Sequence, residues 1–432
     1  MIQGKNYTVY HSKMEYVLPL LAENYVDCIV TDPPYHLKSI VKRFGKENSA
    51  ECKEGTDGSF KRLSKGFMNQ TWDGGDIAFQ KETWEQVYRV LKPGGYILAF
   101  GSPRTYHRLA CAIEDAGFEI RDSVMWVYGS GFPKSYNVGK AVDAKNKYGK
   151  TNPKSMKKAE QENGEGEYKL VGKNNGIMGE TVTYTRKYYE TETGYEGFGT
   201  ALKPAYEPIV MARKPFNTSV ADNIMKYGTG AINIDGCKIG QQGIYHATKL
   251  GANRISYAGH IDRFPANLIF DGSLEAMQGL PEQALNYFYC PKASKKDRDA
   301  GLELDFDSEQ TTDGYMRSNS ESTRKFGANS AKRKNIHPTV KPTELMQYLI
   351  RLVAPKGSII LDPFCGSGST GKACIFENRE RNANYKFIGV EMTDKYIPII
   401  QARLDYAENQ YEYEKKKIEK ETGQLNLFEE EK

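Results

Sequence analysis

Residues 26–35 read Val26-Asp27-Cys28-Ile29-Val30-Thr31-Asp32-Pro33-Pro34-Tyr35. The first six form an apolar run, which predicts a short buried strand. Two prolines directly after a strand must leave the sheet, because neither has an N–H to donate to a neighbouring strand. We therefore expect a rigid ledge at the carboxyl end of the strand, where open α/β sheets usually hold their ligands.

The ledge presents a carboxylate, backbone carbonyls that no strand uses, and an aromatic ring. Asp32 and the carbonyl of Pro33 are placed to accept the two hydrogens of an amine. Pro34 stiffens the turn, and Tyr35 offers a ring for stacking. This chemistry suits a planar group that carries an amine. Taken alone, the same residues are also compatible with a Pro-Pro turn preceded by an incidental Asp.

Length and cysteine usage bound the class of protein. The 432 residues allow two or three average domains, or one α/β domain with insertions. The seven cysteines form no CxxC pair, which favours reduced thiols of a cytoplasmic protein over a disulfide framework or a zinc site. No apolar run approaches the length of a membrane span, and we expect neither a signal peptide, a membrane partner nor a metal.

The net charge of +5 is only mildly basic, but the charge is unevenly distributed. One run between residues 317 and 335 holds a single acid, Glu321. Such a run is suited to phosphate contacts, although a solvated loop has the same composition. Its basic residues are Arg317, Arg324, Lys325, Lys332, Arg333 and Lys334.

Helix and strand signals alternate in the first half of the chain. A short helix is expected around residues 16–23, and Thr83 begins a capping-box pattern that predicts a second helix. Lys92-Pro93-Gly94-Gly95 then turns into a buried strand over 96–100. A helix over 104–116 and a strand over 118–127 complete a βαβαβ series, which predicts a mostly parallel sheet with helices on its faces.

Polar segments interrupt this series. Residues 38–76 predict a long loop that closes over a substrate, or an insertion without function. Residues 134–200 are a polar insertion, and 204–212 resume as a core strand. Residues 214–334 hold short apolar pieces in polar chain, which favours a small irregular module over a part of the main sheet.

The core pattern returns near the C-terminus. Thr343 is expected to cap a helix, and residues 357–362 form a buried strand. A glycine loop, a helix over about 371–377 and a strand over 387–390 follow. From Thr393 the chain predicts one amphipathic helix that becomes strongly charged.

The glycine loop has the spacing of a dinucleotide-binding fingerprint. Gly366, Gly368 and Gly371 match GxGxxG, and Glu391 ends the next strand. Glycines allow a ligand close to the backbone, and an acid at that strand end can hold ribose hydroxyls. The fingerprint alone does not separate a nicotinamide cofactor from another adenosine-containing one.

Two features favour S-adenosylmethionine. The loop opens Asp362-Pro363-Phe364, which places a carboxylate and a ring where a pyrophosphate would need free amides. The chain also carries an amine-accepting ledge, for which hydride transfer has no use. A cofactor with a cationic amino-acid end fits both.

These motifs together resemble the amino-methyltransferases of DNA, in the β group, where the catalytic motif precedes the cofactor motif. Residues 32–35 match the family's DPPY motif, and 362–370 match its DPFCGSGST loop. Residues 335–342, followed by 344–346, match the element before that loop. The ribose-binding strand corresponds to Phe387-Ile388-Gly389-Val390-Glu391, and Lys92–Gly95 matches a core motif.

The resemblance covers about half of the chain and implies a Rossmann-like methyltransferase core in circularly permuted order. Residues 214–334 take the place of the family's target-recognition region. The implied organisation is a catalytic half (1–133), a polar insertion (134–200), a core strand (201–213), the target-recognition region (214–334), a cofactor half (335–408) and a charged tail (409–432).

The resemblance also implies roles for single residues. Asp362 and Pro363 shape the loop, Phe364 packs beside the cofactor, and Glu391 takes the ribose. For the element before the loop, a rigid helix-entry turn is the alternative. The implied cofactor-binding set is Asp362, Pro363, Phe364, Cys365, Gly366, Ser367, Gly368, Thr370, Glu391, His337, Thr339 and Lys341.

The implied reaction is direct in-line methyl transfer to the exocyclic amine of a base flipped out of double-stranded DNA. Hydrogen bonds to Asp32 and the Pro33 carbonyl would localise the amine lone pair, while Tyr35 stacks on the base. No cysteine nucleophile is required, and Cys290-Pro291 has the reverse order to the Pro-Cys of cytosine-carbon methylases.

DPPY predicts adenine N6 as the target, with cytosine N4 as the alternative, because cytosine-amine enzymes more often carry Ser in place of Asp32. Methylation of RNA or of a protein glutamine is disfavoured, since those relatives usually carry Asn there and place the cofactor loop first. A catalytically inactive DNA-binding protein is a further alternative. The resemblance leaves a homodimer and a nuclease partner open.

The tail carries Gln424-Leu425-Asn426-Leu427-Phe428, which resembles the Gln-Leu-x-Leu-Phe peptide that docks on the bacterial replication sliding clamp. Leu425, Leu427 and Phe428 are apolar residues on a charged tail, which favours a pocket that receives them. Packing onto the protein's own surface is the alternative.

Overall fold

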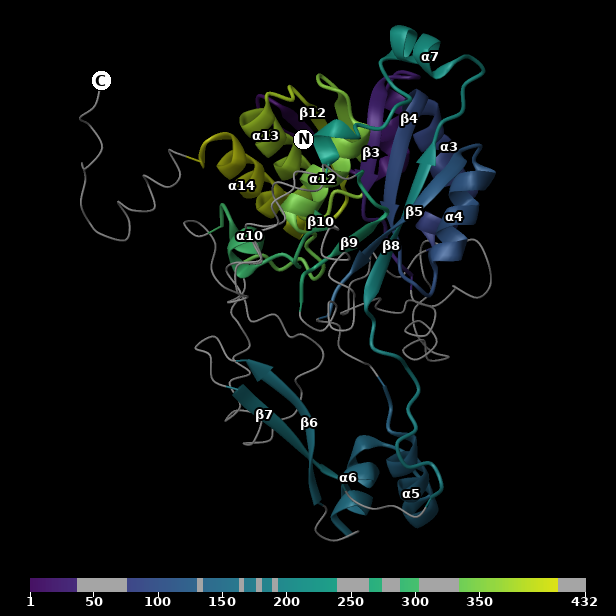
Figure 1. Ribbon diagram of the computed structural model, residues 1–432, viewed down its shortest axis with the longest axis vertical. Coiled ribbons are helices and arrows are strands. Elements are labelled where there is room, and N and C mark those ends of the chain that lie inside the picture. Colours follow the sequence, from purple (N-terminus) through teal and green to yellow (C-terminus); the bar gives the residue numbers. More distant parts are fainter. Residues whose placement is uncertain are drawn as a thin grey trace, which may run out of the picture. The chain divides into compact units, whose positions relative to one another are not determined.

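The computed structural model describes residues 1–36, 76–129, 135–162, 167–175, 181–188, 193–238, 264–273, 288–302 and 334–410 (Figure 1). Residue contacts divide the chain into two compact units. One unit joins residues 1–129 to 206–432, and the other comprises 130–205. The predicted loop at 38–76, apart from Asp76, lies outside the described residues.

The first unit is built on one twisted sheet, whose order is β1-β2-β12-β11-β3-β4-β8-β5-β9-β10. Its strands are β1 (Ile2–Gln3), β2 (Tyr7–His11), β3 (Val26–Thr31), β4 (Leu91–Phe100), β5 (Glu119–Val127), β8 (Tyr206–Arg213), β9 (Leu268–Phe270), β10 (Phe288–Tyr289), β11 (Ile359–Asp362) and β12 (Lys386–Glu391).

Most neighbouring strands run parallel, and β8 runs antiparallel between β4 and β5. Strand β3, from the start of the chain, pairs with β11, from near its end. The pairing sets Cys28 beside Ile360, so the two carboxyl ends reach the same edge of the sheet. The permuted halves therefore meet at the centre, which confirms the predicted α/β architecture.

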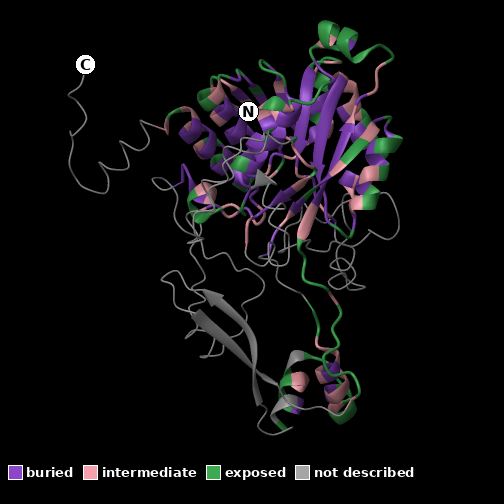
Figure 2. Ribbon diagram, viewed as in Figure 1, coloured by how far each residue is buried: buried purple, intermediate pink, exposed green. Residues whose placement is uncertain are grey.

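Helices cover both faces of the sheet (Figure 1). Alternate side chains of β3 point to opposite faces of the sheet. Cys28 and Val30 pack against the helices of one layer, and Ile29 packs against the helices of the other layer. All six residues of β3 are buried, as Figure 2 shows for the central strands. One layer comprises α1 (Met14–Val17), α3 (Lys81–Val90) and α4 (Tyr106–Asp115), and the other α12 (Thr343–Val353), α13 (Ser369–Arg381) and α14 (Ile397–Glu408).

Both predicted helix caps are wrong. Helix α3 begins at Lys81, and Thr83 lies inside it with its side chain buried. The 3-10 helix η4 (Ile77–Phe79) leads into α3, and the Trp84 indole donates to the Ala78 carbonyl at 2.9 Å. Thr343 is the first residue of α12, and its backbone N–H donates to the carboxylate of Asp297 at 2.9 Å. A side chain distant in sequence thus supplies the cap.

Several element boundaries also differ from prediction. The first helix is α1, which passes into the 3-10 helix η1 (Leu18–Leu20) at Pro19. Strand β4 already begins at Leu91, so the Lys-Pro-Gly-Gly turn belongs to it. Helix α13 is longer than expected. The last helix begins later than expected, because the 3-10 helix η8 (Asp394–Tyr396) precedes it. Pro398 lies in the first turn of α14, where a helix tolerates proline.

Residues 214–334, which the sequence predicts to form a module separate from the main sheet, contribute two described strands to that sheet. Strand β9 extends it beside β5, and β10 follows beside β9. The backbone of Met125 accordingly donates to the Asn267 carbonyl at 2.8 Å. This stretch also holds α7 (Val220–Tyr227), the 3-10 helix η5 (Asp235–Cys237) and α10 (Lys295–Asp299).

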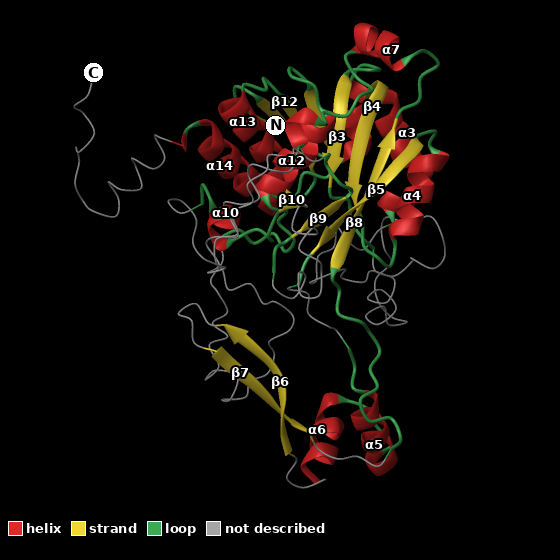
Figure 3. Cartoon of the chain, viewed as in Figure 1, coloured by secondary structure: helices red, strands yellow, loops and turns green. Residues whose placement is uncertain are grey.

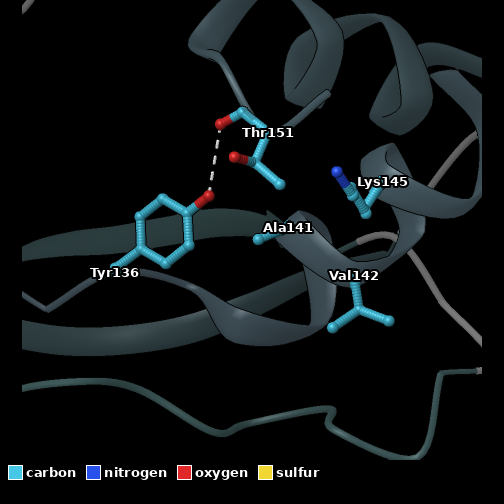
Figure 4. Close-up of a pocket in the computed structure, with 5 residues that line it drawn as sticks. All are labelled: Tyr136, Ala141, Val142, Lys145 and Thr151. Atoms are coloured by element: carbon cyan, nitrogen blue, oxygen red, sulfur yellow. Dashed lines mark hydrogen bonds between the residues drawn. The ribbon is translucent and has the colours of Figure 1, made fainter. Parts of the chain in front are cut away.

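The second unit has regular structure that its polar composition did not predict. It comprises the helices α5 (Val138–Tyr148) and α6 (Pro153–Glu162) and an antiparallel hairpin of β6 (Glu167–Asn175) and β7 (Thr181–Tyr188) (Figure 3). The Asn137 side chain caps α5, and Gly149 ends it at φ 63°. A pocket beside α5 is lined by Tyr136, Ala141, Val142, Lys145 and Thr151 (Figure 4).

We expect Asp297→Asn to lower the free energy of unfolding by about 2–4 kcal/mol, because it removes one partner of a buried ion pair. Asp297 caps α12 and lies 2.9 Å from the Lys372 ammonium, whose side chain is 3% exposed. Urea unfolding measures the loss. Asp235→Asn is the matched control, since its pair with Lys238 is exposed and should contribute little. Equal effects from both substitutions would contradict the assignment.

Candidate active site

The ledge lies at the carboxyl end of β3. Asp32 follows the strand directly, and Pro33 and Pro34 are buried behind it. The Tyr35 carbonyl accepts a hydrogen bond from the Thr105 hydroxyl at 3.0 Å, which ties the ledge to the start of α4. His36, directly after Tyr35, adopts φ 42°, in the left-handed region that few non-glycine residues occupy.

Lys341 reaches this ledge from the turn before α12. Its ammonium donates to Asp32 Oδ2, and it lies 3.3 Å from Glu207 Oε2. Its Nζ also lies 4.8 Å from the centre of the Phe100 ring. Asp32, Glu207 and Lys341 are 18%, 19% and 7% exposed at their side chains. The three form one largely buried charged cluster.

The second carboxylate, Glu207, lies on β8, which runs antiparallel to both of its neighbours, β4 and β5. Glu207 stands near the start of β8, and Ile209 pairs with Phe100 at the end of β4. An antiparallel strand begins at the edge where parallel strands finish. Glu207 Oε2 accepts a hydrogen bond from the Tyr35 hydroxyl at 3.1 Å, and its Oε1 lies 3.5 Å from the Tyr128 hydroxyl.

The electrostatics of the cluster favour a charged Lys341. Burial lowers the pKa of Lys341, but Asp32 and Glu207 outweigh burial and raise it. Burial raises the pKa of Asp32, and the Lys341 ammonium opposes this rise. Burial and the neighbouring carboxylates also raise the pKa of Tyr35, so its phenol is neutral. Two carboxylates thus share one cation.

One oxygen of Asp32 is available. Oδ1 is buried and has no hydrogen-bond partner within the described part of the chain, while Oδ2 is held by Lys341. A buried carboxylate oxygen without a donor is costly, and a ligand N–H would satisfy it. Together with the Tyr35 ring, this atom gives the ledge the chemistry of an amine acceptor.

Asp362 binds within the protein and shapes the glycine loop. Its Oδ1 accepts from the Thr31 hydroxyl at 2.7 Å, and its Oδ2 accepts from the Thr370 hydroxyl at 2.6 Å. The Phe364 backbone N–H also donates to Oδ1, at 3.1 Å. Burial raises the pKa of Asp362 to about 6. Pro363 is buried after it, and the Phe364 ring leans toward Trp84.

The loop is held in a conformation that requires glycine. Gly366 and Gly368 have φ values of 58° and 78°. Glu391 Oε2 accepts from the Gly366 N–H at 2.8 Å, and its Oε1 accepts from the Thr393 N–H at 2.8 Å. A Cβ on Gly366 would lie 3.0 Å from His337 Nε2. The loop therefore presents bare backbone beside a buried acid.

His337 and Cys365 line this region as neutral side chains. Burial lowers the pKa of His337 to about 3, with Lys341 as the next cause. Burial raises the pKa of Cys365 well above its usual value, and its backbone N–H donates to the Val390 carbonyl at 2.9 Å. A buried thiol of this kind is a poor nucleophile.

The predicted residues gather into two adjacent groups. The ledge and the glycine loop meet through the Thr31–Asp362 bond. Lys341, expected at the cofactor, contacts the ledge, and Thr339 is half-buried in the turn before it. Of the six basic residues predicted to meet DNA, Lys334 is described; the other five and the clamp-docking peptide 424–428 lie outside the described residues.

Sequence reasoning missed Glu207, Tyr128 and Arg403. Glu207 gave a usable signal, because it is a lone acid in a segment predicted to be a core strand. Arg403 gave none, since one Arg in an amphipathic helix is ordinary. It is fully buried and donates to the Ser367 hydroxyl at 3.0 Å. No group of metal-ligating side chains gathers in the described ranges.

We expect the difference in free energy of unfolding between wild type and Asp362→Asn to change with pH. As the pH rises from about 4 to about 7, wild type should lose about 2–3 kcal/mol relative to the variant. The folded pKa of Asp362, about 6, lies above the usual value, so the folded state binds its proton more tightly. That contribution is present at low pH and is lost as the carboxyl ionises. Urea unfolding at several pH values measures it, and a constant difference would contradict the burial argument.

Comparison with known proteins gives the family. The sequence model of the N6/N4 methyltransferase family, described as DNA methylase, matches residues 26–402 of this chain. Type II methyltransferase M.HindIII of Haemophilus influenzae is 22% identical over 428 residues, which cover 95% of this chain and 98% of that protein. DNA adenine methyltransferase YhdJ of Escherichia coli is 40% identical over 91 residues, or 21% of this chain and 29% of that protein.

Solved structures align over most of the chain, but with low TM-scores. PvuII DNA methyltransferase (cytosine-N4-specific) is 12% identical, with a TM-score of 0.42 over 93% of this chain and 87% of that one. Such a score is too low to carry an argument about the site. In the described residues no helix is long and apolar enough to cross a membrane. Because its family model spans most of the sequence, the chain belongs to the N6/N4 DNA methylases and is a DNA methyltransferase.

Proposed function

We propose that the chain transfers a methyl group from S-adenosylmethionine to the N6 amine of adenine in double-stranded DNA. The observation that carries this is the buried Oδ1 of Asp32, which has no donor among the described residues and lies next to a strand that ends in a glycine loop. Family membership supplies DNA as the substrate class. The cytoplasm is the compartment we propose.

The chemistry of the loop fits the proposed cofactor. A Cβ on Gly366 would crowd His337, so the loop leaves room for a ligand at the backbone. Each oxygen of Glu391 accepts one backbone N–H and retains a lone pair for a ribose hydroxyl. Phe364 would pack beside the adenosine, with His337 and Thr339 near the amino-acid end. The bound cofactor supplies a methyl group on a cationic sulfonium.

The ledge would activate the amine. Asp32 Oδ1 and the Pro33 carbonyl accept the amine hydrogens, which favours a tetrahedral nitrogen with a localised lone pair. The Tyr35 ring stacks on the flipped base. Positive charge develops on the amine during transfer. The Asp32–Glu207–Lys341 cluster holds two carboxylates and one ammonium, and its net negative charge stabilises the amine. Asp32 or solvent then takes the released proton.

Adenine rather than cytosine is proposed on the sequence of the ledge. DPPY is used mainly for adenine in the family, and one relative over part of the chain is named as an adenine methyltransferase. Cytosine N4 is the alternative. Residues 214–334 are proposed to read the DNA sequence, with the basic run at 317–334 on the phosphates.

Incubation with S-adenosylmethionine and unmethylated DNA is expected to yield N6-methyladenine, identified by mass spectrometry of the nucleosides. Asp32→Ala should lower the rate by at least about a hundredfold, because the amine loses its acceptor. Glu114→Ala is the control, since Glu114 is exposed on α4. N4-methylcytosine would reverse the choice of base, and full activity of Asp32→Ala would contradict the mechanism.

We also propose that the tail docks on the replication sliding clamp, which rests on the sequence of residues 424–428. A peptide of residues 420–432 should bind clamp, and Phe428→Ala should abolish binding, because the ring would fill the pocket. Calorimetry measures both peptides, with Asn426→Ala as the matched control. Absence of heat from the unmodified peptide would reject the proposal. A homodimer is a separate proposal that light scattering tests.

A further inference from the structure

Lys341 is shared between two carboxylates that come from different strands. Its ammonium donates to Asp32 Oδ2 after β3 and lies 3.3 Å from Glu207 Oε2 on β8. It also donates to the Tyr35 hydroxyl at 3.3 Å, and that hydroxyl donates to Glu207 Oε2 at 3.1 Å. The ammonium therefore has two anionic positions within one hydrogen-bonded network.

The Lys341 ammonium is chemically similar to the amine of the target base, because both donate N–H groups to a carboxylate. An N–H of Lys341 occupies one oxygen of Asp32, as an N–H of a substrate amine would. A base that enters the ledge donates to Oδ1, so its amine and the Lys341 ammonium meet at the two oxygens of one carboxylate. The positive charge that develops on the amine during transfer then repels the ammonium from Asp32. The buried ammonium then needs another anion, because leaving it unpaired is expensive.

We propose that Glu207 is a positioning residue that receives Lys341 when the target amine donates to Asp32 Oδ1. Lys341 holds Asp32 Oδ2 before the base arrives, and Glu207 holds the cation afterwards without loss of an ion pair. This inference rests on the proposed amine methylation and adds a residue and an exchange step to it. The exchange itself involves no covalent step, since only the hydrogen-bond partners of the ammonium change.

Three observations support the exchange. The distance from Nζ to Glu207 Oε2 is already 3.3 Å, so a small side-chain movement completes the transfer. Tyr35 bridges the two positions, which keeps the ammonium solvated by the protein along the way. The Phe100 and Tyr35 rings flank the ammonium, at 4.8 Å and 5.4 Å from Nζ to their centres, and favour a cation at either position.

The net charge of the cluster gives a test that distinguishes the exchange from a purely structural role of Glu207. The cluster carries two carboxylates and one ammonium. Glu207→Gln leaves a neutral pair in which Lys341 stays on Asp32. Lys341→Met leaves two buried carboxylates, of which one takes up a proton. The double variant leaves Asp32 alone with the original net charge, and Asp32 is then free to accept the amine.

The experiment measures single-turnover methyl transfer at saturating S-adenosylmethionine, across pH 6–9, on DNA that the wild type methylates. We expect each single variant to be about a hundredfold slower than wild type, the loss that a misplaced catalytic group produces. The double variant should recover to within about tenfold, a non-additive coupling between contacting residues. Lys341→Met should also shift the pH profile upward, because Asp32 loses its cation.

A second readout does not depend on turnover. The four proteins, loaded with S-adenosylhomocysteine, are titrated with dAMP by calorimetry, and Glu207→Gln should bind about tenfold more weakly while the double variant recovers. Glu119→Gln is the matched control, because it breaks a strand-borne ion pair with Arg213 at the other end of β8. Thermal melting checks the fold of every variant, and S-adenosylmethionine affinity is measured separately.

The outcomes separate the two proposals. A double variant no faster and no tighter than the worse single variant overturns the exchange. Loss of S-adenosylmethionine affinity in Lys341→Met also overturns it, because Lys341 would then be a cofactor ligand. The expected dAMP pattern in a protein that methylates no adenine would overturn the proposed function and leave the exchange standing.

Discussion

The hydrogen bond from the Thr31 hydroxyl to Asp362 Oδ1, at 2.7 Å, joins two strands from opposite ends of the chain. It is buried between β3 and β11, whose parallel register brings their carboxyl ends to one edge. Thr370 binds the second oxygen of Asp362 at 2.6 Å and fixes the glycine loop that follows. The ledge and the loop are therefore held as one site.

The site is dominated by buried carboxylates. Asp32, Glu207, Asp362 and Glu391 all lie at the carboxyl edge of the sheet, and Lys341 is the cation between the first two. Burial raises the pKa of Asp32, Asp362 and Glu391. Such an excess of acids favours cationic ligands and a transition state in which positive charge moves onto the bound group. A methyl transfer from a sulfonium to an amine has this character.

The predictions failed where tertiary packing overrode a local sequence pattern. Thr343 reads as a helix cap, but Asp297 caps α12 because the fold brings α10 against its first turn. Thr83 reads as a cap, but its side chain is buried inside α3. The apolar segments around Phe270 are predicted to form an irregular module, but β9 pairs with β5 in the main sheet. A strand of three residues is too short to show a periodic pattern in the sequence.

The sequence by itself determined the parallel α/β architecture, the ledge at Asp32 and the glycine loop, because each depends on neighbours in the chain: an apolar run, two prolines, and glycines at fixed spacing. Only the tertiary structure decided that Lys341 faces Asp32 and that Glu207 completes the cluster. These residues lie 134 positions apart (341 − 207), and the antiparallel direction of β8 brings Glu207 to the site. Contacts made through strand direction and packing leave no local pattern, so the charge balance of the site appears only in the fold.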